Sequence, residues 1–206
     1  YSLLDMSLQG GLGDVTATKN VLLSYGTSGY GITDTYENIT VVGHNNGTDF
    51  WLVSRIRGKF LVWKITASGF STPQVFNIGI DLGVHPTIDR AGIGSIKLSP
   101  DGSKVIHMDF SQGTYLTIGD FNSETGAITN IQSIKTGIKG LYGIEFSPSG
   151  KYVYMSGIEG SMGLYIKPVS NLNPPYIKAV SNIVNVQLGS DNRIYGISDP
   201  YTPVPL

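Results

Sequence analysis

Three side chains of the sequence have the chemistry that hydrolysis of an ester-like bond needs. His85 and Glu145 carry groups that can accept a proton from water, and the guanidinium of Arg90 can stabilise a developing oxyanion. They lie up to 60 positions apart in the sequence, so they can act together only if the fold brings their segments to one place. The elements that must position them therefore decide whether this chemistry is available.

Metal and cofactor chemistry has little support in the sequence. The histidines His44, His85 and His107 stand alone, without a His-x-x-x-His pair, and the chain has no cysteine and no Asp-x-Asp-x-Asp-Gly run. His107 alternates with apolar neighbours, which predicts a place on the surface of a sheet. We therefore expect no metal ion and no cofactor.

The glycine cluster QGGLGDV, residues 9–15, superficially resembles a phosphate-binding loop. Such a loop needs a following helix whose N-terminus faces the phosphate groups. The segment DVTATKNVLL that follows is β-branched and strand-like. The cluster is therefore predicted to be a turn between two strands.

Composition excludes several partners. Charged residues make up only 14% of the chain, while Gly (27 residues) and Tyr (12 residues) are abundant, which is typical of many short strands joined by tight turns. The net charge is −1 with no basic run, so nucleic acid is not an expected partner. No apolar run approaches 18 residues, so membrane insertion is not expected either.

A hairpin motif repeats along the chain and predicts the architecture. LSPDGSKVIHM (98–108) and FSPSGKYVYM (146–155) both read as strand, tight turn and strand. Two weaker copies share a Gly or Asn where the turn needs a positive φ. The four turn residues are Gly47, Gly102, Gly150 and Asn192.

Alternating strands on both sides of these hairpins complete four-stranded antiparallel units. The predicted fold class is an all-β β-propeller of four-stranded blades, with a two-sheet sandwich as the alternative. We expect one domain or fragment over residues 1–206 that holds four blades' worth of strands. Its predicted parts are a half blade at 1–23, blades at 36–80, 92–136 and 140–182, and a half blade at 183–199.

The hairpins resemble the blades of YVTN and WD-like propellers. The ordered motifs YSLLDMSLQGGLGDVTATKNVLL, ENITVVGHNNGTDFWLVS, IGSIKLSPDGSKV and YGIEFSPSGKYVYMS are more specifically similar to the repeat region of gliding-motility-associated surface proteins that carry a type B sorting domain for type IX secretion. This resemblance implies export across the outer membrane of a bacterium and display at the cell surface. It also implies further blades in the same parent protein, and the start at Tyr1 agrees with a chain cut from a longer one.

In a propeller, the loops that enter each inner strand converge at one mouth of the central channel, where loops on a rigid scaffold commonly bind ligands. Aromatic, charged and polar side chains in these loops are the candidate binding residues. They are Tyr36, Glu37, His85, Asp89, Arg90, Lys139, Tyr142 and Asn182.

Two functions remain open at this stage. The first is a non-catalytic extracellular propeller for adhesion, protein docking or carbohydrate contact, whose partners would be a protein or glycan ligand and the polypeptide that completes the ring. The alternative is a lactonase-like hydrolase, because related propellers carry acid–base residues around the channel. His85 or Glu145 would then be the base and Arg90 the oxyanion stabiliser. The first is the main expectation, so the chain is not expected to be an enzyme.

Overall fold

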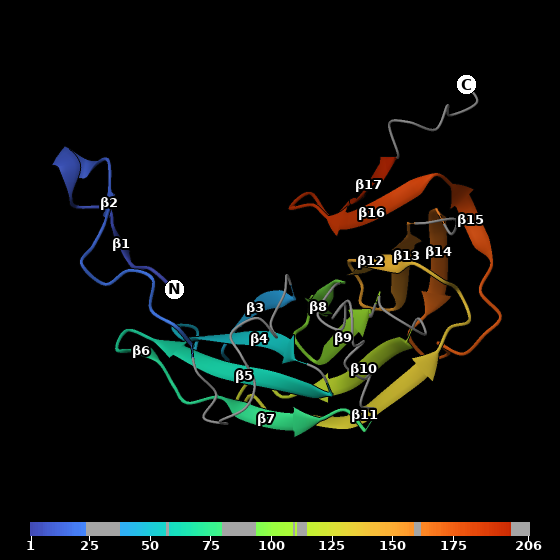
Figure 1. Cartoon of the computed structure of the whole chain (residues 1–206), viewed down its shortest axis with the longest axis horizontal. Helices are drawn as coiled ribbons and strands as arrows, with labels where there is room; N and C mark the ends of the chain where they lie inside the picture. Colours follow the sequence, from blue (N-terminus) through green and yellow to red (C-terminus); the bar gives the residue numbers. More distant parts are fainter. Residues whose placement is uncertain are drawn as a thin grey trace, which may run out of the picture.

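The computed structural model describes residues 1–23, 38–56, 58–79, 94–108, 110, 115–158 and 162–198. In these residues almost all regular structure is antiparallel β-sheet, and the sheets follow one another along an open arc (Figure 1). The predicted propeller-type all-β fold is confirmed. Within the described ranges, no helix is long and apolar enough to cross a membrane.

Three sheets form the body of the arc. The first contains β3 (Ile39–Gly43), β4 (Phe50–Ile56), β5 (Lys59–Thr66), β6 (Gly69–Phe70) and β7 (Gln74–Asn77). The second contains β8 (Ile96–Leu98), β9 (Lys104–Met108), β10 (Tyr115–Phe121) and β11 (Ile128–Lys135). The third contains β12 (Leu141–Phe146), β13 (Tyr152–Gly157), β14 (Gly163–Pro168) and β15 (Lys178–Ser181). In the second and third sheets the strands pair in chain order, as the repeat predicts.

A hairpin flanks the three sheets on either side. At one end of the arc β1 (Leu4–Asp5) pairs with β2 (Asp14–Val15), and at the other β16 (Ile183–Leu188) pairs with β17 (Ile194–Ser198). The glycine cluster forms the turn between β1 and β2 with a single 3-10 turn, η1 (Gln9–Gly11), and the described residues that follow it, up to residue 23, contain no α-helix. The predicted strand–turn–strand structure of this segment is confirmed.

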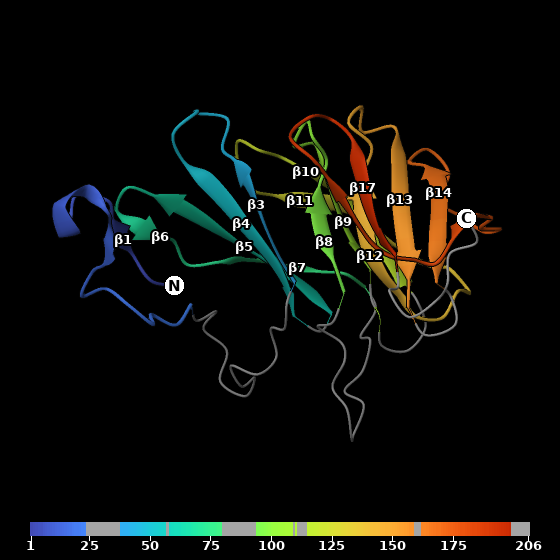
Figure 2. The same cartoon turned by 90° about the horizontal axis from the view of Figure 1, so that it is seen from above.

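The four turn residues adopt the same conformation. Gly47, Gly102, Gly150 and Asn192 have φ between 62° and 75°. The amide of each donates a hydrogen bond to the carbonyl oxygen three residues earlier, at N–O distances of 2.8–3.1 Å. The turns between β3 and β4 and between β12 and β13 lie along the same edge of the arc (Figure 2). The equivalence that the sequence predicts for these turns is confirmed.

The hydrophobic core lies between adjacent sheets. Trp51 and Phe60 of the first sheet pack in one cluster with Val105 and Phe121 of the second. A separate cluster joins the second and third sheets, and it contains Ile106, Met108, Phe146, Met155 and Tyr165. Burial between blades is the main favourable term for such a fold, so each sheet depends on its neighbours.

His107 is buried rather than exposed on the surface of its sheet. Its side chain is fully buried, and its Nε2–H donates to the Oδ1 atom of Asn38 at 3.2 Å. Burial, and next the positive charge of Arg55, hold the pKa of His107 well below the usual 6.5. The prediction from apolar–polar alternation was wrong because both faces of the second sheet are covered by neighbouring sheets.

Substitution of a turn glycine by valine tests the hairpin repeat. Gly102→Val and Gly150→Val should each lower the free energy of unfolding by more than about 1 kcal/mol, because a β-branched residue is strained at positive φ. The matched controls Gly102→Asn and Gly150→Asn should cost less, since Asn192 already occupies the equivalent position. Equal denaturation midpoints for the Val variants and the unmodified chain would contradict the assigned turns.

Burial of neutral His107 predicts loss of stability in mild acid. Because its folded pKa lies below 6.5, the unfolded chain binds the extra proton first, and stability should fall as the pH drops below about 6.5. One titrating group contributes a slope of up to about 1.4 kcal/mol per pH unit. Denaturation of the unmodified chain and of His107→Gln between about pH 7 and about pH 5 measures this slope. An equal slope for both proteins would show that His107 is not the group responsible.

Candidate functional site

The inner strands of successive sheets meet around the centre of the arc. β3 contacts β8, β8 contacts β12, and β12 contacts β16. The amide of Ser95, next to β8, donates to the carbonyl oxygen of Tyr142 in β12 at 3.1 Å. In each of the four hairpins, the residue five positions before the turn residue lies at the equivalent position of the inner strand. These equivalent residues are Val42, Lys97, Glu145 and Gln187.

Three of these four equivalent side chains bind one another across the sheets. The ammonium of Lys97 lies 3.0 Å from the Oε2 atom of Glu145 and donates to the Oε1 atom of Gln187 at 2.7 Å. We name Lys97, Glu145 and Gln187 the polar layer. One cation thus connects β8, β12 and β16.

Glu145 is the anchor of the polar layer. Its residue is only 4% exposed, and its carboxylate accepts hydrogen bonds from the amides of Phe146 at 3.0 Å and Leu188 at 3.1 Å. With the Lys97 ion pair, three donors therefore offset the cost of burying this charge. A carboxylate satisfied in this way is suited to fix the Lys97 ammonium in place.

A cavity of about 200 Å³ lies at the same inner strands. Its exposed wall is mostly polar, and Lys97 is the basic residue among those that line it. The cavity lies toward the beginnings of the inner strands, away from the four turns. The residues that line it are Ile39, Gly94, Ser95, Ile96, Lys97, Tyr142 and Asn185.

Two glycines allow the strands to approach closely beside this cavity. A Cβ atom on Gly143 would lie 2.4 Å from the Oγ of Ser156 and 2.5 Å from the Oδ1 of Asn185. A Cβ atom on Gly94 would lie 2.1 Å from the carbonyl oxygen of Met108. Real Cβ atoms do not occur at such distances. At Gly94 the obstacle is backbone, so glycine is required there, whereas a side chain at Gly143 would force the Ser156 and Asn185 side chains to shift.

Only some of the predicted binding residues lie among the residues that the structure describes. Tyr142 lines the cavity, and its ring meets that of Phe110 edge-on at 6.3 Å. Lys139 is exposed in the turn before β12, and Asn182 precedes β16 with a φ of 64°. The other predicted binding residues lie outside the described residues. They are Tyr36, Glu37, His85, Asp89 and Arg90.

Sequence reasoning did not single out Lys97, Gln187, Ser95 or Asn185. A signal for the first two was present, because counting back five positions from each turn residue aligns Lys97 with Glu145 and Gln187. For metal ions, no group of three histidine or acidic side chains gathers within the part of the chain that the structure describes.

The chain is similar to known proteins in structure but not in sequence. No family model matches it, and no curated protein sequence does. A candidate 6-phosphogluconolactonase from Bacteroides uniformis matches with a TM-score of 0.50 and 18% identity, over 77% of this chain and 46% of that one. A second, from Bacteroides fragilis, has a TM-score of 0.52 and 16% identity, over 77% and 41%. The periplasmic gluconolactonase of Pseudomonas aeruginosa has a TM-score of 0.52 and 18% identity, over 78% and 42%.

These comparisons correct the expected function. The chain spans less than half the length of these three structures, and at such low identity the likeness establishes the fold alone. All three are named as lactonases, which contradicts the expectation of a non-catalytic adhesion or docking module and the expectation that the chain is not an enzyme. The lactonase-like alternative is the one that the comparisons favour.

A double-mutant cycle tests the polar layer. Glu145→Gln should destabilise the fold by about 2 kcal/mol or more, because it removes the charge that offsets Lys97 and places an amide near existing donors. Lys97→Met should also destabilise the fold, because it leaves the buried Glu145 carboxylate with two backbone amides and no cation. The double variant should be more stable than the sum of the two losses predicts. Additive losses in chemical denaturation would show that the two side chains do not interact.

Proposed function

We propose that the chain belongs to a lactone-hydrolysing propeller and that lactones of sugar acids react at the cavity beside Lys97. The observation that carries this proposal is that Lys97 lines a polar cavity at the inner strands and that its ammonium is fixed by Glu145 and Gln187. A sugar-acid lactone presents hydroxyl groups and one carbonyl, and Ser95, Tyr142 and Asn185 offer polar atoms to such a ligand. The names of the structurally similar proteins support the same substrate class.

Lys97 stabilises the charge that develops during the reaction. Water adds to the lactone carbonyl carbon, and the carbonyl oxygen becomes an oxyanion. The bond from that carbon to the ring oxygen then breaks, and the proton lost by the water passes to the ring oxygen, which leaves a hydroxy acid. A fixed cation beside the oxyanion lowers the barrier because it needs little reorganisation when the charge forms.

Glu145 is a positioning residue in this scheme rather than the base. Its carboxylate already accepts three donors and does not line the cavity, so it holds Lys97 instead of meeting the substrate. Gln187 fixes the same ammonium from the next inner strand. His85 and Arg90 remain the candidate base and second cation in the proposal, and they lie outside the described residues.

We also propose that the protein acts outside the cytoplasm of a bacterium. The support is the sequence resemblance to exported, gliding-motility-associated surface proteins. Fractionation of the native host with an antibody against the chain tests this proposal, and recovery of the protein only in the cytosol would contradict it.

Lactone hydrolysis is measured directly as acid release at constant pH. The chain should hydrolyse gluconolactone or 6-phosphogluconolactone above the rate in buffer, and Lys97→Met should lose about 100-fold in kcat/KM. Lys104→Met is the matched control, since Lys104 is also paired with an acidic residue, Asp120 at 2.7 Å, but on strands away from the cavity. No rate above buffer, or equal losses for both variants, would overturn the proposal.

A further inference from the structure

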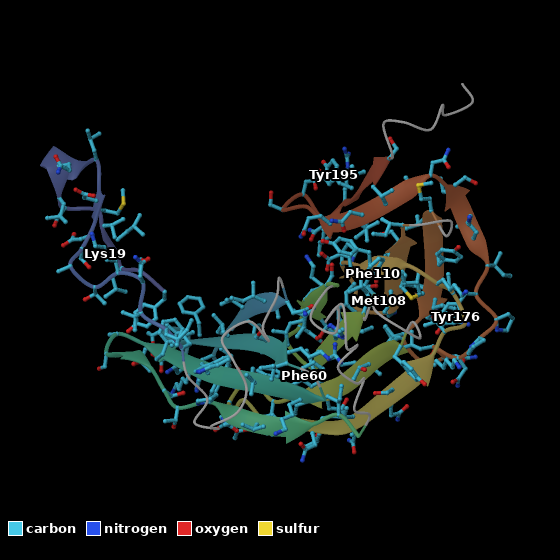
Figure 3. The ribbon with its side chains drawn as sticks, in the orientation of Figure 1. Lys19, Phe60, Met108, Phe110, Tyr176 and Tyr195 are labelled. Atoms are coloured by element: carbon cyan, nitrogen blue, oxygen red, sulfur yellow. The ribbon has the colours of Figure 1, made fainter. Side chains whose placement is uncertain are left out.

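A second set of equivalent residues lies beside the polar layer, seven positions before each turn residue. The inner strands that carry this set lie between Met108 of β9 and Tyr195 of β17 (Figure 3). Side chains two positions apart share one face of a strand, so the second set faces the same side as the polar layer. Ser95 and Asn185 of this set line the cavity together with Lys97. The four residues of the second set are Thr40, Ser95, Gly143 and Asn185.

The side chain of Asn185 is fixed at its oxygen end. Its Oδ1 atom accepts a hydrogen bond from the amide of Val186 at 2.8 Å. The same atom occupies space that the absence of a side chain at Gly143 leaves open, because a Cβ atom there would lie 2.5 Å from it. The Nδ2 atom has no acceptor among the described residues. Because Asn185 lines the cavity, the two N–H groups of Nδ2 are available to a ligand there.

Ser95 is fixed by its backbone, while its hydroxyl group remains available. The amide of Ser95 donates to the carbonyl oxygen of Tyr142 at 3.1 Å, and its carbonyl oxygen accepts from the amide of Met108 at 2.9 Å. The hydroxyl group has no hydrogen-bond partner within the described ranges, and it can both donate and accept. The cavity therefore has a second polar group on a rigid inner strand.

The Lys97 ammonium can meet one further acceptor. An ammonium has three N–H groups, and Glu145 and Gln187 engage two of them. The third is sufficient for the carbonyl oxygen of a lactone. The donors of Ser95 and Asn185 therefore exceed what the carbonyl group requires, and they suit the hydroxyl groups of a ring derived from a sugar.

We propose that Ser95 and Asn185 determine the substrate specificity of this cavity by binding hydroxyl groups of the lactone ring. This inference rests on the proposed function and deepens it, because it selects polyhydroxylated lactones over lactones whose rings carry only hydrogen. A ring without hydroxyl groups would leave both side chains without partners inside the occupied cavity, which reduces affinity. Lys97 alone could not make this distinction, since every lactone has the carbonyl group that it binds.

Hydrolysis of two lactones measures this specificity. Gluconolactone and δ-valerolactone share one ring and one carbonyl group, but only the first carries hydroxyl groups on the ring. Dividing each rate by the rate of the same lactone in buffer removes the difference in intrinsic reactivity. The unmodified chain should prefer gluconolactone by at least about tenfold in kcat/KM. Ser95→Ala and Asn185→Leu should each reduce that preference about fivefold, mainly through KM.

Two variants away from the cavity are the matched controls. Ser133→Ala removes a hydroxyl group that hydrogen-bonds to Thr117 at 3.0 Å, and Asn171→Leu removes an Oδ1 atom that accepts from the amide of Asn173 at 3.2 Å. Neither Ser133 nor Asn171 lines the cavity, so both variants should keep the preference of the unmodified chain. An equal loss of preference in the controls, or an unchanged preference in Ser95→Ala and Asn185→Leu, would overturn the inference.

Binding of two lactams separates this inference from the proposed function, because lactams resist hydrolysis. By calorimetry, the unmodified chain should bind the lactam of gluconic acid at least about tenfold more tightly than δ-valerolactam, and Asn185→Leu should reduce this ratio about fivefold. That result without hydrolysis of either lactone would contradict the proposed function and support the inference. Equal affinity for the two lactams, or binding of neither, would overturn the inference even if both lactones are hydrolysed.

Discussion

The ion pair between Lys97 and Glu145 is the interaction on which the centre of the arc depends. It joins inner strands of two different sheets, and Gln187 extends it to a third strand. The carboxylate can be buried only because two backbone amides and one ammonium meet it, and those amides belong to β12 and β16. The packing of the neighbouring inner strands and the position of the Lys97 ammonium therefore depend on each other.

That constraint also links the fold to the proposed chemistry. Gly94 and Gly143 let backbone and side chains approach beside the cavity at distances that a Cβ atom would prevent. The resulting wall is polar in a molecule whose other contacts between sheets are largely apolar. A fixed cation in such a place is suited to stabilise negative charge, and it comes from the rigid inner strands instead of from a loop.

The sequence predicted the repeated elements better than the contacts between them. Turn chemistry is local, so Gly102 and Asn192 could be aligned from sequence alone, and their positive φ values agree. Burial of His107 depends on a neighbouring sheet, which one strand's alternation does not encode. Glu145 was recognised as a candidate base, but its role as an anchor follows from amides on two strands that only the assembled fold brings together.

A crystal structure of the chain with the lactam of gluconic acid tests the central claim most directly, because this analogue keeps the carbonyl but resists hydrolysis. The account predicts that the analogue occupies the cavity with its carbonyl oxygen within about 3 Å of the Lys97 ammonium, while Lys97 keeps its contact with Glu145. An analogue bound elsewhere on the chain, or an empty cavity at saturating concentration, would contradict it.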